Sequence, residues 1–248
     1  MREKITAIIP TLNEERNIEG AIASLVFADE IIVIDSYSTD KTKSICEKHN
    51  VRFIQRVFDD FSSQKNHAID QASYDWIFVL DADERIPPDL SKEIIGKVKD
   101  PEGCVAFNIY RTFFFKGDII RYGGWQTDKV VRLFRGDKCR YDGKLVLEKV
   151  SCEGRVGSMK QRMDHYSYQS REQYEGKLSF YAELQAKELI EKQKKFSWLH
   201  QIVKPAFRFF VLYIIRFGFL DGKRGFTLAL VQSKGVLLRY LKIKELKN

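Results

Sequence analysis

The chain has 248 residues, 44% of them hydrophobic and 13% aromatic, which is enough for one large domain plus a C-terminal extension. The formal net charge is +8, and residues 201–248 account for all of it, with ten Lys or Arg against two acids. The first 200 residues are therefore close to neutral, which argues against a nucleic-acid-binding protein. The N-terminus lacks the long apolar stretch and cleavage site of a secretory signal, so a cytoplasmic location is expected.

The basic C-terminal segment is also rich in Phe, Leu, Ile, Val and Tyr, and this combination favours a membrane surface over nucleic acid. Its most apolar run, Phe209–Ile215, has seven residues between two arginines, whereas a bilayer span needs roughly 20. We expect residues 166–248 to form a helical, amphipathic extension that lies on a membrane. The alternative is a solvated basic face on a pair of packed helices.

The four cysteines form no CxxC pair and no His/Cys cluster. A disulfide framework and a zinc site are therefore not expected, and reduced thiols are the default for such a chain. The four are Cys46, Cys104, Cys139 and Cys152.

The first hundred residues alternate short apolar runs with segments of helical periodicity. This order predicts a parallel, doubly wound sheet in which the first and fourth strands are neighbours. In such sheets ligands bind beyond the carboxyl ends of the strands. Strands are predicted over 5–9, 30–34, 51–54 and 76–80, and helices over 18–26, 40–46, 62–72 and 88–98, with Ser62 or Ser63 opening the third helix.

The middle of the chain predicts two more strands, over 105–110 and 130–134. Between them, glycines near Trp125 indicate loops and an active-site flap, and residues 166–193 are predicted as one long helix. Neither GxGxxG nor GxxxxGK[ST] occurs, which disfavours a dinucleotide-dependent dehydrogenase and a P-loop NTPase.

The strongest local motif is Asp81-Ala82-Asp83-Glu84, directly after a predicted buried strand. Three carboxylates in four residues repel one another, which would raise their pKa values unless a cation compensates. Hard oxygen ligands suit Mg²⁺ or Mn²⁺, which keep open positions for substrate phosphates. Asp81 and Asp83 are therefore the candidate metal ligands. The alternative is a polar turn that closes the strand.

Further polar residues follow the first two predicted strands. Thr11 and Asp35 suit contacts to a nucleotide base, Asp81 suits ribose hydroxyls, and Asp83 suits the metal. The alternative for the residues after the second strand is helix capping, which we prefer for Asp40. The candidates at this edge of the sheet are Pro10, Thr11, Asn13, Glu14, Asp35, Asp81, Ala82 and Asp83.

These motifs together resemble glycosyltransferase family 2, and within it the bacterial lipopolysaccharide-core β-1,4-glucosyltransferase group. The resemblance implies a GT-A fold: an α/β, doubly wound mixed sheet with a Rossmann-like N-terminal half over residues 1–165, followed by the helical extension over 166–248. The segments that carry it are Ile8–Glu15, Val33–Asp40, Gln64–Asn66, Leu80–Glu84, Gly124-Trp125, Arg132–Phe134 and Asp164–Tyr168.

The resemblance also implies an inverting, metal-dependent transfer of a sugar, with glucose expected, from a UDP-sugar donor. The implied acceptor is the lipopolysaccharide core or another cell-envelope glycan, glycolipid or lipid-linked, at the cytoplasmic face of the bacterial inner membrane. The family's base corresponds to Glu148, although Leu147 replaces the group's His, and Asp128 is the second candidate. Glu148 could instead be a surface acid paired with Lys144 or Lys149.

Other candidates each carry two interpretations. Lys65 either reaches the donor or is a solvated helix residue, and one of Arg132 and Arg135 contacts phosphate while the other is a strand-edge charge. Trp125 either stacks on a sugar or closes the core, and His165 is either structural or a substrate ligand. Alternative functions are a nucleotidyltransferase that makes NDP-sugars, which lacks its Gly-rich loop here, and a nucleotide-sugar-binding protein without transferase activity.

Overall fold

A computed structural model describes residues 2–143, 148–168, 170–192 and 199–247. The chain divides into two compact units, each described here by itself. The first unit comprises residues 1–111 and 129–165. The second comprises residues 166–248 together with 112–128, so the glycine-containing segment groups with the helical extension.

Four parallel strands form one half of the main sheet, in the order β3-β2-β1-β4. The predicted adjacency of the first and fourth strands is therefore confirmed. Strands β1, β2 and β4 are largely apolar and buried, as expected of a parallel sheet, whereas β3 at the edge exposes Arg52 and Gln55. The strands are β1 Ile5–Thr11, β2 Glu30–Asp35, β3 Arg52–Gln55 and β4 Trp76–Val79.

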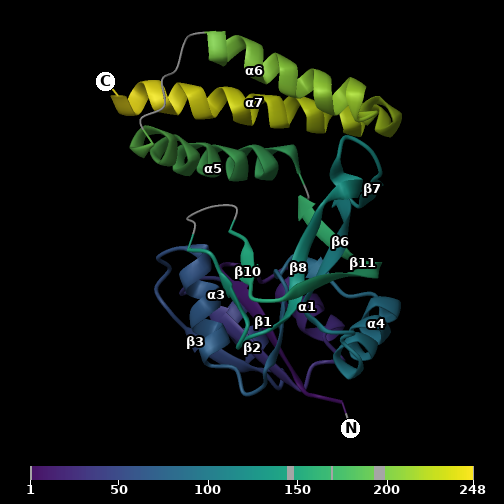
Figure 1. Ribbon diagram of the computed structural model, residues 1–248. Coiled ribbons are helices and arrows are strands. Elements are labelled where there is room, and N and C mark those ends of the chain that lie inside the picture. The colour runs from purple at the N-terminus through teal and green to yellow at the C-terminus, as the bar shows by residue number, and fades with distance from the viewer. Residues whose placement is uncertain (1, 144–147, 169, 193–198, 248) are drawn as a thin grey trace. The chain divides into compact units, whose positions relative to one another are not determined.

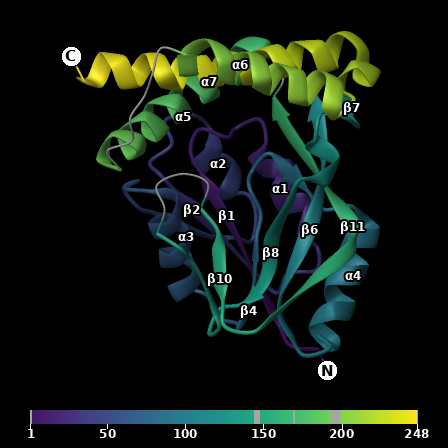
Figure 2. The ribbon, with the colours of Figure 1, turned by 45° about the horizontal axis from the view of Figure 1, so that its top comes forward.

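Helices cover both faces of these strands (Figure 2). Along β1, Ile5, Ala7 and Ile9 belong to the core cluster that includes α1 and α4, whereas Ile8 packs in the cluster that includes α3. This alternation follows from the two-residue period of a strand and makes the sheet doubly wound. The helices are α1 Ile18–Ser24, α2 Thr42–Cys46, α3 Phe61–Asp70 and α4 Pro88–Lys99.

The third helix begins earlier than predicted. Asp60 caps α3 by accepting a hydrogen bond from the Ser63 backbone N at 2.8 Å, so Ser62 and Ser63 lie inside the helix. A carboxylate oxygen at the N-cap satisfies a backbone N–H that the helix itself leaves unpaired.

The second half of the sheet continues the order as β4-β8-β6-β11-β5, with β7 on β6. Strand β8 is antiparallel to both β4 and β6, and β5 is antiparallel to β11. The sheet is therefore mixed, as the resemblance implied. The predicted helix start at Tyr166 is wrong, because the chain stays extended through Tyr168 and α5 begins at Arg171. These strands are β5 Glu84–Arg85, β6 Cys104–Phe115, β7 Asp118–Ile120, β8 Lys129–Arg135 and β11 Arg155–Tyr168.

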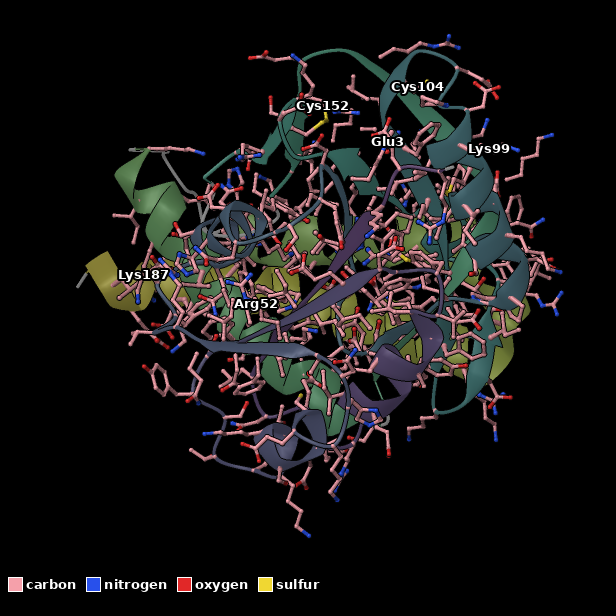
Figure 3. All side chains as sticks on the ribbon, turned by 90° about the horizontal axis from the view of Figure 1, so that it is seen from below. Glu3, Arg52, Lys99, Cys104, Cys152 and Lys187 are labelled. Carbon is pink, nitrogen blue, oxygen red and sulfur yellow. A yellow bond between two sulfur atoms is a disulfide. The ribbon has the colours of Figure 1, made fainter. Side chains whose placement is uncertain are left out.

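Two short strands, β9 Cys139–Tyr141 and β10 Val150–Cys152, form a separate antiparallel pair. Their register places Cys139 opposite Cys152, and the two are joined in a disulfide (Figure 3). The expectation that all cysteines are reduced is therefore wrong for this pair. Cys46 and Cys104 are buried free thiols, as expected.

The second unit is mainly helical, and α7 lies between α5 and α6 (Figure 1). The apolar run Phe209–Ile215 belongs to α6 and to the π-helical segment that follows it. Within the described residues, no helix is both long and apolar enough to cross a bilayer. The elements are η1 Trp125–Thr127, α5 Arg171–Glu191, α6 Leu199–Phe210, η2 Val211–Ile215, η3 Gly218–Asp221 and α7 Gly222–Lys247.

Candidate active site

The carboxyl ends of β1 and β2 are joined residue to residue. Thr11, which follows Pro10 in β1, pairs with Asp35 in the sheet register, and the Ser36 backbone N donates to the Thr11 carbonyl at 2.9 Å. Asp35 is fully buried, and its carboxylate accepts hydrogen bonds from the Ser38 backbone N at 2.9 Å and from Gln55 at 3.2 Å. The two predicted base-binding residues therefore lie side by side on a fixed edge of the sheet.

The loops after β1 and β2 are held together by reciprocal hydrogen bonds. Asn13 takes a left-handed backbone conformation with φ of 55°, which asparagine tolerates better than most residues. Its backbone N donates to the Ser38 hydroxyl at 2.8 Å, and its side-chain oxygen accepts from the Thr39 backbone N at 2.8 Å. The Glu14 backbone N donates to the Thr42 hydroxyl at 2.9 Å. Asn13 and Glu14 thus shape the edge on which Thr11 and Asp35 lie.

Asp40 is structural, although the N-cap residue of α2 is Lys41 rather than Asp40. Its carboxylate accepts from the backbone N of Thr42 at 2.9 Å and from that of Glu15 at 3.0 Å. Burial alone would raise the pKa of Asp40, but the Thr42 donors outweigh it and the pKa is lowered. Asp40 therefore ties the two loops together as an anion.

Arg132 of β8 clamps the acidic motif. Its guanidinium donates to the Asp81 carboxylate and, at 2.7 Å, to the fully buried Glu84 carboxylate, which Arg111 also reaches at 3.3 Å. Glu84 in turn accepts from the Asp81 backbone N at 3.0 Å. The repulsion among these carboxylates, which led us to expect a cation, is thus partly compensated by arginine. Ala82, the second residue of the motif, is buried in the core.

Lys65 of α3 faces the same carboxylates. Its ammonium nitrogen lies 2.6 Å from Glu148 Oε1 and 3.9 Å from Asp81 Oδ1, and the residue is only 5% exposed. The interpretation of Lys65 as a solvated helix residue is therefore wrong. Glu148 is paired with Lys65 rather than with Lys149, and its other predicted partner, Lys144, lies outside the described residues.

The charges in this cluster stabilise one another. Burial would raise the pKa of the Asp81 carboxyl, but Arg132 and Lys65 hold it well below its ordinary value. Burial would lower the pKa of Lys65, but Tyr141, Asp81 and Glu148 together raise it. Lys65 is therefore a permanent cation and Asp81 a permanent anion at neutral pH.

His165 joins the acidic motif through the pairing of β5 with β11, in which it lies opposite Glu84. Its Nε2 is 3.5 Å from Asp83 Oδ2, and both side chains are largely buried. Among the residues that the structure describes, no three His, Cys, Asp or Glu side chains are arranged to hold a metal. The Asp83–His165 pair nonetheless offers a carboxylate oxygen and an imidazole nitrogen, which suit a divalent cation with room for further ligands.

Two predicted site residues belong to the second unit. Trp125 stacks on Phe113 with ring centroids 4.0 Å apart and meets the edge of Tyr174 at 6.4 Å, so its ring is used in the core of that unit. The backbone N of Asp128 donates to the Trp125 carbonyl at 3.2 Å and closes the short η1 helix. The packing interpretation therefore describes Trp125, and the structure does not group Asp128 with Glu148.

Sequence reasoning missed how two residues support the site. Asn66 pairs its side-chain amide with both backbone groups of Tyr141, at 3.0 and 3.2 Å, and so fixes β9 beside Lys65. Arg85 donates to the carbonyls of Ala82 and Asn17, each at 2.8 Å, and so ties the acidic motif to α1. Asn66 belongs to the Gln64–Asn66 segment of the resemblance, for which no role of Asn66 was predicted, and nothing in the sequence indicated a role for Arg85.

A doubly wound mixed sheet with an acidic Asp-x-Asp loop at the carboxyl end of a central strand is the architecture of an α/β enzyme that binds its ligand at that edge. Residues 6–148 match the model of glycosyl transferase family 2. The chain therefore belongs to glycosyltransferase family 2, as the motifs indicated, and is a transferase.

Relatives match over nearly the whole chain. An uncharacterized glycosyltransferase of Rickettsia bellii is 30% identical over 99% of this chain and 88% of its own length. The lipopolysaccharide core biosynthesis glycosyltransferase LpsC of Rhizobium meliloti is 27% identical over 96% of this chain and 91% of its own. A solved structure, glucosyl-3-phosphoglycerate synthase from Mycobacterium tuberculosis with Mn²⁺, UDP and glucosyl-3-phosphoglycerate, is 26% identical over 46% of this chain and 45% of that one, with a TM-score of 0.38.

Proposed function

We propose that the protein is an inverting, metal-dependent hexosyltransferase that moves a sugar, with glucose expected, from a UDP-sugar to the lipopolysaccharide core or another cell-envelope glycan. The observation that carries this proposal is the cluster of Lys65, Asp81, Arg132 and Glu148 at the carboxyl edge of the sheet, next to the Asp83–His165 pair. The similarity to LpsC supports a lipopolysaccharide-core acceptor.

Each part of the donor has a candidate partner. Thr11 and Asp35 face the base, and Asp81, about a third exposed, suits the ribose hydroxyls. Asp83 and His165 would hold Mg²⁺ or Mn²⁺, and the imidazole favours Mn²⁺ because nitrogen ligands suit transition metals. When bound, the metal would neutralise charge on the departing diphosphate. Lys65 and Arg132 supply fixed positive charge beside it.

Glu148 is the proposed base. The acceptor oxygen attacks the anomeric carbon, the bond to the diphosphate oxygen breaks, and the hydroxyl proton passes to the Glu148 carboxylate. The 2.6 Å contact with Lys65 holds Glu148 in place and links it to the donor side of the site. Asp128 stays the second candidate for this role.

The acceptor is proposed to be a glycolipid or lipid-linked glycan at the cytoplasmic face of the bacterial inner membrane. The basic, aromatic-rich C-terminal segment supports a peripheral position there. Residues 1–165 are proposed to carry donor binding and catalysis, and residues 166–248 the contact with the membrane.

A thermal-shift screen of UDP and UDP-sugars, with and without Mn²⁺, tests the donor site, because a ligand of the folded state raises its melting temperature. We expect a metal-dependent rise with UDP that is lost in Asp83→Asn and His165→Gln. The exposed Asp89→Asn is the matched control and keeps the rise. No rise with any nucleotide, with or without metal, would overturn the proposal.

A further inference from the structure

The outward face of α6 is apolar. Ile202, Val203, Phe207 and Phe210 are between 48% and 64% exposed. At 3.6 residues per turn these four positions fall within less than half of the helix circumference. A helix on the surface of a globular protein normally presents polar side chains on its outer side, so this face is the reverse of the usual pattern.

The exposed apolar surface continues beyond α6 through η2 and η3. Five large hydrophobic residues between Ile214 and Leu220 are 43% to 56% exposed. We name this surface the outer apolar face. Its members are Ile202, Val203, Phe207, Phe210, Ile214, Ile215, Phe217, Phe219 and Leu220. Contiguous apolar surface of this kind marks an interaction site.

The inward side of α6 is already used in packing against α7. The Ser233 hydroxyl donates to the Pro205 carbonyl at 2.5 Å, and Arg208 donates to Gln232 at 3.4 Å. Leu212 is buried at the start of the segment that follows. The side of α6 that packs on α7 therefore includes polar contacts, whereas the opposite side exposes hydrophobic side chains.

The charges around the outer apolar face are almost all positive. Between residues 199 and 230 there are five Lys or Arg, of which Lys204, Arg216, Lys223 and Arg224 are exposed, the last of them paired with Asp118. The one acid, Asp221, accepts hydrogen bonds from the backbone N of Arg121 and of Tyr122, the latter at 2.8 Å. An apolar centre with a cationic margin complements anionic lipid headgroups over acyl chains.

A second copy of this chain fits the same surface less well. In a symmetric dimer both subunits use the same surface patch, so a contact through this face would place the cationic margin of one subunit against that of the other. Like charges directly opposed across an interface are costly. The surface therefore favours a lipid partner over a copy of the protein.

We propose that the outer apolar face inserts into the headgroup region of a bilayer that contains anionic lipid, with α6 in the membrane plane. This rests on the proposed function for the membrane location and adds the residues and the mode of attachment. Because insertion buries apolar surface, binding should persist at high salt concentration, where charges are screened. Adsorption through charge alone should be lost under the same conditions.

Co-sedimentation with vesicles of phosphatidylcholine and phosphatidylglycerol tests the proposal. We expect Val203→Glu/Phe207→Glu to lower the bound fraction at least about tenfold. The matched control is Val26→Glu/Val57→Glu, which changes two exposed apolar residues of the first unit and the same net charge, and keeps binding within about twofold. Equal losses in the two variants overturn the proposal.

Two further measurements separate the alternatives. At about 0.5 M NaCl, where exposed charges are largely screened, the unsubstituted protein is expected to stay bound, and its complete release overturns insertion. Light scattering measures the oligomeric state. If Val203→Glu/Phe207→Glu converts a dimer to a monomer and leaves vesicle binding unchanged, the outer apolar face is a protein interface and the insertion proposal is overturned. The UDP-dependent thermal shift of this variant is expected to be unchanged, so failure of insertion and failure of the donor site are distinguishable.

Discussion

Arg132 and Arg135 lie on the same strand, β8, but in different environments. Arg132 is buried and holds Glu84 and Asp81, whereas Arg135 lies at the surface near Glu3, Asp75 and Asp137. A buried carboxylate that loses its cation is left charged in a medium of low polarity. Exposed ion pairs contribute little because water screens them.

Arg132→Met is therefore expected to lower the free energy of unfolding by about 3 kcal/mol, because the buried Glu84 carboxylate loses its shorter cationic contact and keeps the longer one with Arg111. Arg135→Met is the matched control on the same strand, with an expected loss below about 1 kcal/mol. Urea denaturation of the two variants measures both values. Similar small losses in the two would contradict the assigned role of the clamp.

Glu148→Gln is expected to lower kcat by about 10²- to 10⁴-fold, because an amide cannot take the acceptor proton. The UDP-dependent thermal shift should persist, since the amide oxygen still accepts a hydrogen bond from Lys65. Glu153→Gln is an exposed control with unchanged turnover. If Asp128→Asn rather than Glu148→Gln abolishes turnover, Asp128 is the base.

Much of the site was visible in the sequence because its residues follow apolar runs of strand length. Thr11, Asp35 and Asp81 could be placed at one edge from the strand order alone. The partners of the acidic motif could not, because Arg132, Lys65 and His165 come from distant elements. Arg132 and His165 are brought to the motif by the antiparallel pairs β4–β8 and β5–β11, and Lys65 by the packing of α3. Charge type predicted that the carboxylates need compensation, but not which group provides it.

At the scale of elements, apolar strands were predicted and polar ones were missed. Strands β1, β2 and β4 are runs of Ile, Val and Phe, and their positions agree with the prediction to within a few residues. Strand β11 is rich in polar residues and carries Met159 and Met163 as buried anchors, so its sequence lacks strand periodicity. The disulfide was missed because its two cysteines are close only when β9 pairs with β10.

The β9–β10 disulfide predicts a thiol count. In denaturant without reductant, two thiols per chain should react with Ellman's reagent, and four after reduction. Burial raises the pKa of the Cys46 thiol to about 11, so it should not react in the folded protein near pH 8. Four reactive thiols before reduction would show that the pair is not joined.

Glu30, the first residue of β2, links its strand to Thr6 of β1 and to Ser73. These contacts lead us to expect a stability that depends on pH. It accepts hydrogen bonds from the Thr6 hydroxyl at 2.6 Å and from the Ser73 backbone N at 2.8 Å. Burial would raise the pKa of Glu30, but these donors outweigh burial and lower it below its ordinary value of 4.5. A carboxyl whose pKa is lowered by folding stabilises the fold above its unfolded pKa, and this contribution is lost as the pH falls through the lowered value.

Glu30→Gln should therefore reduce stability at pH 7, and the difference from the unsubstituted protein should narrow as the pH falls below about 4. Urea denaturation at both pH values measures the difference, with the exposed Glu47→Gln as the control. A deficit that does not change with pH would mean that the carboxylate charge is not what stabilises this junction.

At the scale of the whole molecule, positive charge is concentrated in one part of the chain. Residues 201–248 carry all of the net charge of +8. A protein held at a lipid surface meets a lipid-linked acceptor at a high effective concentration, without any change in the site itself. The benefit of attachment should therefore appear only when the acceptor shares that surface.

Val203→Glu/Phe207→Glu should lower turnover of an acceptor embedded in anionic vesicles by about tenfold and leave turnover of a water-soluble acceptor fragment within about twofold. Steady-state rates with the two acceptor forms measure this difference. Equal losses on both acceptors would place the effect in the catalytic unit rather than in surface attachment.

The division of the chain has a consequence for deletion analysis. The backbone passes between the two units three times, because residues 112–128 belong with 166–248. In the second unit Phe113 and Phe115 pack with Tyr174, Leu228 and Val231. A fragment that ends at residue 165 would therefore keep residues 112–128 without the side chains against which they pack. Aggregation of that fragment would not show whether the catalytic half can fold. A clean separation requires two excisions, with a short linker in place of 112–128.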